Sequence, residues 1–187
     1  MKQKHEILFT PVRVGGVTVK NRFVHAPMEG TTPINWYAGF KFNEGSREYL
    51  VERAKNGVGL IIPGITCVKS LMGNKWLYQS EKMFMGPIHD LMEEIHGYGS
   101  KFFLQIGAGF GRVLVMPKEL KKVMNNKVLG KMIGTDKLLV AASDNMPNVW
   151  DPNVLQRAMT EEEIQDIIQG FAKAAALCKR AGIDGIE

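Results

Sequence analysis

Phe102–Ile106 reads FFLQI, a continuous apolar run with one polar side chain near its end. Gly97 and Gly99 precede the run and are placed to end a helix, and the glycine-rich segment Gly107–Gly111 follows it. A short apolar run between turn residues is typical of a strand buried on both faces of a parallel sheet. Gln105 must find hydrogen-bond partners at the C-terminal end of that strand, where parallel α/β sheets bind ligands. The run therefore predicts a central strand and a candidate ligand contact.

Other segments predict the neighbouring strands. Val58–Ile62 is a second apolar run bounded by glycine and proline, and Arg22–Pro27 is a shorter one. Ile183–Glu187 begins a fourth strand. Near the start of the chain, Pro11–Val14 and Val17–Lys20 flank a Gly-Gly pair. Because glycine tolerates the positive φ of a tight primed turn, these two runs predict a β-hairpin.

Helical patterns lie between the predicted strands. Ser46 is placed to cap the first helix and Gly57 to end it, and Pro87 stands at a plausible first position of the second. Thr160 and Glu163 form a capping box before the third helix, since each side chain can accept from the other's backbone N–H. The apolar face predicted for this helix consists of Ile164, Ile167, Ile168, Phe171, Ala175 and Leu177.

The predicted order is a hairpin followed by strands that alternate with helices, with a long loop over Glu29–Gly45. Such alternation implies right-handed crossovers and a parallel sheet with helices outside. A doubly wound sheet and half of a barrel both fit this pattern. A complete TIM barrel needs about 250 residues, so a chain of 187 residues fits most of a half-barrel rather than a whole one. No linker, internal repeat or low-complexity stretch divides the sequence, and we expect one domain.

Composition narrows the class of protein. The hydrophobic content of 45% is ordinary for a globular protein, and no apolar run approaches the ~20 residues that span a membrane. The N-terminal lysines are followed by no apolar segment, so a secretory signal is not expected. Cys67 and Cys178 are isolated, which gives no disulfide framework and no metal-binding Cys-x-x-Cys spacing. These features predict a protein of the reducing cytoplasm.

Part of the formal charge of +5 is concentrated in Pro117–Lys137, where six lysines face only Glu119 and Asp136. A basic loop of this kind either holds an anionic ligand, such as a phosphate-bearing thioester or nicotinamide cofactor, or is a solvated surface segment. Nucleic acid fits poorly as a partner, because no recognised binding motif and no interleaved aromatic residues accompany the charge.

Three segments carry a family resemblance: Leu8–Met28, Phe102–Arg112 and Ala181–Glu187. Together they resemble the N-terminal part of the Old Yellow Enzyme family, which comprises ene-reductases that depend on flavin mononucleotide (FMN) and are built on a TIM barrel. Ala142–Pro152, followed by Arg157–Thr160, resembles the loop leading into the third barrel helix in the 2,4-dienoyl-CoA reductase and bile-acid-inducible branch. The resemblance implies that residues 1–187 are the N-terminal portion of one FMN-binding barrel domain, ending at the fourth barrel strand after an N-terminal β-hairpin.

The resemblance also implies cofactor contacts. In the family, the tripeptide at Ala26, Pro27 and Met28 lies against the isoalloxazine ring, and the next residue, commonly Thr or Cys, tunes the flavin. Here that residue is Glu29, whose carboxylate should disfavour reduction of a ring that gains negative charge. The resemblance places Ile65 where a smaller residue usually approaches the flavin. Gln105 stands where a family glutamine bonds the pyrimidine edge, whereas the residue alone favours a glutamine satisfied by neighbouring backbone.

The activity that the resemblance implies is transfer of a hydride from NADH or NADPH, through FMN, to an activated C=C bond. Candidate substrates are CoA thioesters and steroid-like enones. The family's catalytic residues follow the strand that Ala181–Glu187 begins, so the sequence assigns none. An iron–sulfur (4Fe-4S) cluster and FAD belong only to later regions of the long branch.

Two alternatives to a self-sufficient enzyme stay open. The chain could be a non-catalytic truncated or split fragment that needs a partner chain, in which case uncovered strand edges and apolar faces would favour self-association. A dihydroorotate dehydrogenase-like barrel is less favoured, because the hairpin leading into Asn21-Arg22 and the Gln105 strand match the ene-reductases better.

Overall fold

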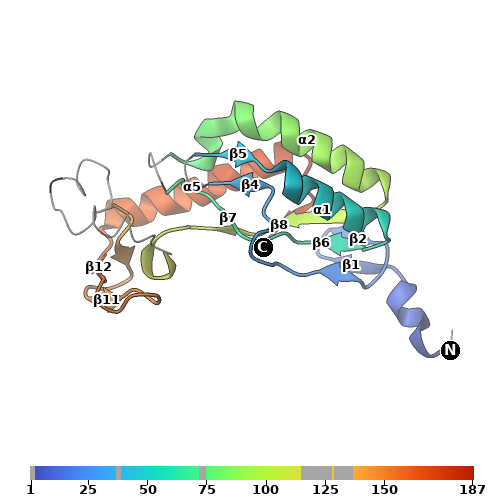
Figure 1. Cartoon of the computed structure of the whole chain (residues 1–187), viewed down its shortest axis with the longest axis horizontal. Coiled ribbons are helices and arrows are strands. Elements are labelled where there is room, and N and C mark those ends of the chain that lie inside the picture. The colour runs from blue at the N-terminus through green and yellow to red at the C-terminus, as the bar shows by residue number, and fades with distance from the viewer. Residues whose placement is uncertain (1–2, 37–38, 72–74, 115–127, 129–136) are drawn as a thin grey trace.

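A computed structural model describes residues 3–36, 39–71, 75–114, 128 and 137–187 (Figure 1). Its strands are β1 (Val12–Val14), β2 (Val17–Val19), β3 (Val24–His25), β4 (Ile34–Asn35), β5 (Lys41–Phe42), β6 (Leu60–Ile61), β7 (Thr66–Cys67), β8 (Lys101–Leu104), β9 (Ile106–Gly107), β10 (Val140–Ala141), β11 (Met146–Pro147), β12 (Leu155–Ala158) and β13 (Gly185–Ile186). Its helices are α1 (Glu44–Lys55), α2 (Glu81–Gly97) and α5 (Glu161–Arg180), with the 3-10 turns η1 (Gln3–Phe9), η2 (Leu77–Ser80) and η3 (Gly111–Val113).

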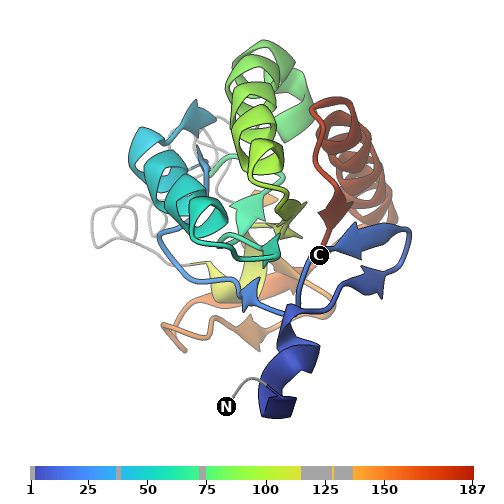
Figure 2. The ribbon, with the colours of Figure 1, turned by 90° about the vertical axis from the view of Figure 1, so that its right-hand side faces the viewer.

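The central sheet is parallel, and its strands β3, β6, β8 and β13 are neighbours in the order in which the chain makes them. Its register places His25 beside Ile61 and Ile61 beside Phe102. Since every crossover advances to the next strand in one direction, all three helices fall on one face of the sheet, as Figure 2 shows. A doubly wound sheet would reverse direction and place helices on both faces. The arrangement is therefore half of a TIM barrel preceded by the predicted β-hairpin.

The main core lies between the sheet and the helices. Ile61, Phe102 and Leu104 point from the strands into this core and are fully buried. Leu50 of α1 and Ile88 of α2 meet them from the helix side. Each such side chain stabilises the fold by about 1.5–3 kcal/mol through burial. The alternation along β8 leaves Lys101, Phe103 and Gln105 for the opposite, inner face of the barrel.

Helix α1 begins two residues before the predicted cap. Asn43 is the N-cap residue, and its side-chain oxygen accepts from the backbone N–H of Ser46 at 3.3 Å. Asparagine caps at least as well as serine, and the Ser46 hydroxyl instead donates to the carbonyl of Gly30. The prediction for the C-terminus is confirmed, because Gly57 follows the last turn with a φ of +91°.

Helix α2 begins at Glu81, so the prediction that Pro87 opens it is wrong. A proline inside a helix removes a hydrogen bond to the preceding turn and costs about 3 kcal/mol. Here the buried stripe extends across the proline from Phe84 through Ile88 to Ile95. The burial of Phe84, which lies before the proline, offsets much of that cost.

Helix α5 begins with the predicted capping box, in which Thr160 and Glu163 exchange hydrogen bonds. The predicted apolar face is only partly correct. Ile168, predicted to be on the apolar face, is 52% exposed. Besides Leu177, the buried residues of α5 are small: Gly170, Ala174 and Cys178. A Cβ at Gly170 would lie 2.3 Å from the Trp76 ring, so α5 packs closely because this position has no side chain.

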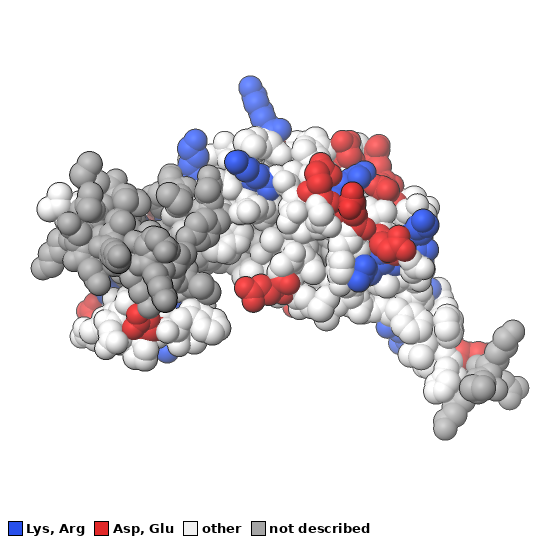
Figure 3. Space-filling view, viewed as in Figure 1, with Lys and Arg blue, Asp and Glu red and all other residues white. Residues whose placement is uncertain are grey.

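Two predicted loops contain short strands. The Glu29–Gly45 segment holds the antiparallel pair β4 and β5. The segment before α5 holds the three-stranded sheet β10-β12-β11, which sits apart from the central sheet at the left of Figure 1. Most of the predicted basic loop, Pro117–Lys137, lies outside the described residues. On the face seen in Figure 3, acidic and basic side chains are interspersed over the helices rather than gathered by sign. None of the described helices has the length and apolarity that a membrane span requires.

Candidate functional site

The C-terminal ends of the first three barrel strands meet at one edge of the sheet. The backbone N–H of Ile62 donates to the carbonyl of His25 at 2.9 Å, and that of Thr66 donates to the carbonyl of Gln105 at 2.8 Å. These two bonds join the end of β3 to the end of β6, and the start of β7 to the end of β8. The candidate contacts predicted from the sequence therefore lie along one continuous edge.

Thr31 ties the first strand end to the second. Its hydroxyl donates to the carbonyl of Met28 at 2.8 Å and accepts from the N–H of Gly64 at 2.7 Å. A Cβ at Gly64 would lie 2.1 Å from the Met28 carbonyl oxygen, closer than real Cβ atoms approach. Gly64 therefore lets the two loops touch, a role that no sequence pattern indicates.

The six candidate contacts differ in exposure. Ala26, Met28, Glu29 and Ile65 are exposed, with Met28 and Ile65 each 46% accessible, while Pro27 is half-buried. Gln105 is also half-buried, and its carboxamide makes no hydrogen bond to any described residue. The alternative that neighbouring backbone satisfies Gln105 thus finds no support among the residues that the structure describes. A side chain with two donors and an acceptor remains available to a ligand.

The glycines after Gln105 have a packing role. A Cβ at Gly107 would lie 2.3 Å from Cδ1 of Ile65, and one at Gly109 would lie 2.5 Å from Sγ of Cys67. Strands β7 and β9 pair in parallel at this point, with Thr66 beside Ile106. The side chains of the β7 segment therefore occupy the space that residues larger than glycine would fill. In particular, Ile65 lies over Gly107 and forms part of the inner surface.

Glu29 has a second environment. Together with Asn43, Ser46 and Tyr49 it lines a shallow cleft at the first turn of α1. The N-terminus of a helix carries partial positive charge, which favours a carboxylate there. Glu29 therefore lies at a cleft beside the start of α1.

His25 is buried, and only one of its ring nitrogens has a partner among the residues that the structure describes. Nδ1 lies 3.2 Å from the carbonyl of Ile62, which fits the tautomer that donates from Nδ1. Nε2 is buried with no partner among the described residues. The ring packs edge-to-face on Tyr49 of α1, with centroids 5.6 Å apart. His25 therefore faces the helices rather than the strand-end edge.

A charged cluster lies at the opposite, N-terminal end of the strands. Asp184 accepts from Nε2 of His96 at 2.7 Å, from Nζ of Lys101 at 2.8 Å and from the N–H of Phe102 at 2.9 Å. Burial raises the pKa of Asp184, but these three hydrogen bonds together outweigh burial and hold the pKa below its ordinary value. No local sequence pattern indicates this cluster, because Asp184 is more than 80 residues away from each of its partners in the chain. Its position at the bottom of the barrel marks it as structural.

One group of possible metal ligands is present among the described residues. His89, Asp90 and Glu93 are exposed on α2, and their ligand atoms lie within 4.8 Å of one another. Exposed side chains of this kind are common without a metal, and the candidate edge does not include them.

The fold and the exposed C-terminal ends of its strands together define a class of protein. A parallel sheet that grows in chain order, with helices outside and ligand-accessible strand ends, is the first half of a TIM-type barrel. Residues 7–187 match the family model described as NADH:flavin oxidoreductase / NADH oxidase. The chain therefore belongs to the NADH:flavin oxidoreductase / NADH oxidase family, whose model spans all but its first residues.

Curated relatives agree with this assignment. The chain is 33% identical over 193 residues to cinnamate reductase of Clostridium sporogenes, an alignment that covers 100% of this chain and 26% of the relative. It is 31% identical to NADH oxidase of Thermoanaerobacter brockii over 96% of this chain and 25% of that protein. A probable NADH-dependent flavin oxidoreductase of Bacillus subtilis is 28% identical, with 45% of its length covered. The chain thus spans between about a quarter and just under half of these relatives.

Solved structures give the same fold. The Old Yellow Enzyme of Pichia sp. AKU4542 superposes with a TM-score of 0.65 at 24% identity, over 96% of this chain and 45% of that one. The homologue from Zymomonas mobilis superposes with a TM-score of 0.64 at 22% identity, over 96% of this chain and 47% of that one. These likenesses establish the N-terminal half-barrel that the sequence resemblance predicted.

Proposed function

We propose that this chain forms the strand-end part of the FMN site in an oxidoreductase of the ene-reductase type. The observation that carries the proposal is the half-buried Gln105 carboxamide, which has no hydrogen-bond partner among the described residues and lies at the strand-end edge. The ends of the two neighbouring strands along the same edge supply the exposed residues Ala26, Met28 and Ile65. A flat ring with hydrogen-bonding groups on one side suits this combination.

Each candidate contact has a role in the proposal. Gln105 would donate to and accept from the pyrimidine edge of the ring. Ala26, Pro27 and Met28 would contact the ring through their main chain, and Ile65 would cover it from the second strand end. Glu29 would stay at the α1 cleft, since a carboxylate next to a ring that gains negative charge opposes its reduction.

Bound FMN would supply the redox chemistry, taking a hydride from NADH or NADPH and delivering it to an activated C=C bond. The similarity to cinnamate reductase favours an α,β-unsaturated carboxylate or a related activated alkene, of which CoA thioesters and steroid-like enones are further examples. The residues that hold the substrate and supply the proton are not assigned to this chain. The proposed location is the cytoplasm, which is consistent with the two free, buried cysteines.

A second possibility is a chain that works only when another polypeptide completes the barrel. The edge strands support it, because β3 and β13 each lack a second neighbour among the described strands. Val24 is 52% exposed on β3 and Ile186 is 39% exposed on β13. Open edges and exposed apolar side chains would be covered either by further barrel strands of the same protein or by a partner chain.

The test begins with the coding DNA that follows Glu187. If the frame continues through the remaining strands, the whole protein is expressed, and we expect it to retain FMN, oxidise NADH or NADPH and reduce cinnamate. Gln105→Leu should weaken FMN binding by about tenfold, the effect of losing a hydrogen bond worth about 1.4 kcal/mol. Gln169→Leu, at an exposed position of α5, is the control and should bind FMN as the parent does.

Two results would contradict the proposal. A complete protein that binds no FMN would refute the flavin site itself, and equal FMN affinity in the parent and in Gln105→Leu would remove Gln105 from it. If a stop codon follows Glu187 instead, co-purification of a second polypeptide that restores FMN binding would support the split form.

A further inference from the structure

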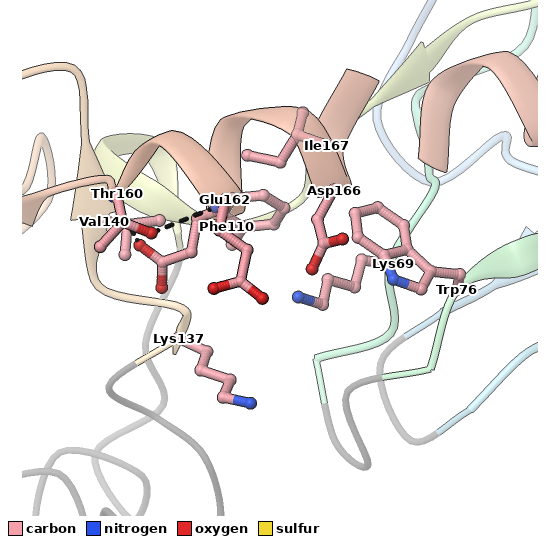
Figure 4. Close-up of a pocket in the computed structure, with 10 residues that line it drawn as sticks. Lys69, Trp76, Phe110, Lys137, Val140, Thr160, Glu162, Asp166 and Ile167 are labelled. Atoms are coloured by element: carbon pink, nitrogen blue, oxygen red, sulfur yellow. Dashed lines mark hydrogen bonds between the residues drawn. The ribbon is translucent and has the colours of Figure 1, made fainter. Parts of the chain in front are cut away.

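A second cleft lies between the segment that follows β7 and the first two turns of α5. Its volume is about 290 Å³, at the lower end of the range for small-molecule sites. The lining residues that matter here are Lys69, Trp76, Phe110, Lys137, Glu162 and Asp166 (Figure 4). None of them belongs to the proposed flavin contacts.

One wall of this cleft is aromatic and basic. Nζ of Lys69 lies 4.7 Å from the centre of the Trp76 ring and 5.6 Å from that of the Phe110 ring. The ammonium of Lys69 forms no ion pair or hydrogen bond with a described residue. Burial lowers the pKa of Lys69, the charge of Lys137 lowers it further, and Asp166 and Glu163 oppose that effect. The lysine is thus partly desolvated and lacks a carboxylate in direct contact.

The facing wall is acidic. Glu162 and Asp166 are four residues apart on α5, so they project from the same side of the helix. Figure 4 shows both carboxylates turned toward the ammonium of Lys69. Neither forms an ion pair with the residues that the structure describes. The adjacent Glu163 is already used, because Arg157 donates to it at 2.7 Å. Two lysines and two carboxylates therefore face each other across the cleft with no direct bond between them.

This distribution of charge selects the ligand. An anion would meet the lysines but also two carboxylates, and a cation would meet the carboxylates but also two lysines. A molecule with both a carboxylate and an ammonium satisfies the two walls at once, and an apolar group on it would pack on Trp76 and Phe110. We propose that the cleft binds a small zwitterion of the amino-acid type with an aromatic or apolar side group.

Three probes that share a phenylethyl skeleton and differ in their charged groups test this site. L-Phenylalanine carries both groups, 3-phenylpropionate lacks the ammonium, and 2-phenylethylamine lacks the carboxylate. Binding is measured by titration calorimetry on the protein as purified. Because 3-phenylpropionate is also the product of cinnamate reduction and can bind the proposed active site, only binding that the cleft variants below change is assigned to the cleft. We expect saturable binding of phenylalanine and at least tenfold weaker binding of the other two.

Variants assign the charges to residues. Lys69→Met should weaken phenylalanine binding at least tenfold and leave 2-phenylethylamine no weaker. Asp166→Asn should weaken phenylalanine and strengthen 3-phenylpropionate. The matched control is Lys173→Met, because Lys173 also lies over an aromatic ring, Tyr78 at 5.0 Å, but does not line the cleft. Circular dichroism melts confirm that each variant folds, and Lys69→Gln replaces Lys69→Met if the latter does not.

Several results would overturn the proposal. One is no saturable binding of phenylalanine. A second is equal or tighter binding of 3-phenylpropionate or 2-phenylethylamine, which would make the cleft an anion or cation site. A third is loss of phenylalanine binding in Lys173→Met to the same degree as in Lys69→Met.

Discussion

The backbone N–H of Thr66 donates to the carbonyl of Gln105 over 2.8 Å, although 39 residues separate them in the chain. This bond fixes the segment that leaves the second barrel strand beside the end of the third. Because Ile65 immediately precedes Thr66, its side chain comes to lie over the glycine run that follows Gln105. The candidate site is thus held by backbone bonds between strand ends, and its side chains are free to meet a ligand.

The contact between Gly64 and Met28 predicts a penalty for any side chain at position 64. Gly64→Ala would place a Cβ 2.1 Å from the Met28 carbonyl oxygen, so the two loops must separate. We expect a loss of about 1–3 kcal/mol in the free energy of unfolding, measured by urea denaturation. Gly86→Ala is the control, because nothing lies within 4 Å of that position in α2, and it should stabilise the protein by up to about 1 kcal/mol. Equal effects of the two substitutions would disprove the contact.

The capping box of α5 predicts a pH dependence. A hydrogen bond from Arg157, opposed by burial and aided by Thr160, lowers the pKa of Glu163 to about 2 from its ordinary 4.5. A carboxyl whose pKa is depressed on folding stabilises the protein above its unfolded pKa, and that contribution is lost as the pH falls from about 4.5 toward 2.

Glu163→Gln can keep the capping-box bond but loses the charge that faces Arg157. It should therefore be less stable than the parent at pH 7, by up to about 1 kcal/mol, and the difference should shrink on acidification. Thermal melts from pH 7 to pH 3 measure this difference. Glu161→Gln, in the same first turn but outside the box, should show a much smaller change. A gap between the parent and Glu163→Gln that stays constant with pH would contradict the assignment.

The open edge of β3 predicts self-association when the chain is expressed alone. Val24 is 52% exposed on an edge strand, where unpaired backbone groups and apolar side chains attract another sheet edge. Val24→Lys should shift the chain toward monomer, as measured by size-exclusion chromatography with light scattering. Val14→Lys, a similar change at an exposed position of the hairpin, should not. A chain that is already monomeric and saturated with FMN would refute this expectation.

Local patterns predicted the parts of the fold that local interactions determine. FFLQI, predicted as one strand, contains three of the four residues of β8 and the first residue of β9, with Gln105 between the two strands. The Gly-Gly pair joins the two strands of the hairpin, and Thr160 with Glu163 caps α5. The errors arose where tertiary contacts compete with local signals. Asn43 rather than Ser46 is the N-cap residue of α1, and the Ser46 hydroxyl instead donates a hydrogen bond to the carbonyl of Gly30 in the preceding loop.

The candidate site shows the same division. The place of Gln105 in an apolar strand drew attention to it, but its role as a candidate flavin contact, like those of the five other candidate residues, came from the family resemblance. Gly64 could not be recognised in this way, because its importance depends on Met28, which is 36 residues away in the sequence. The Asp184 cluster likewise depends on register between strands, which the sequence pattern does not specify.

The packing of Ile65 on Gly107 predicts coupling between two positions of the site. In Gly107→Ala, the new methyl group would lie 2.3 Å from Cδ1 of Ile65, so that side chain must move off the inner surface. Because Ile65 is 46% exposed and its end can shift, we expect a loss of only about 0.5–1.5 kcal/mol in the free energy of unfolding, the cost of forcing that side chain from its rotamer. In a protein that already carries Ile65→Ala, the space beside position 107 is empty, and Gly107→Ala should lower the free energy of unfolding much less.

A double-mutant cycle on the free energy of unfolding measures this coupling, which we expect to be at least about 0.5 kcal/mol. Gly97→Ala in both backgrounds is the control, since its position is open and far along the chain from Ile65. Additive effects of Gly107→Ala and Ile65→Ala would show that the two residues do not compete for space. The inner surface at the second strand end would then have to be shaped by a residue other than Ile65.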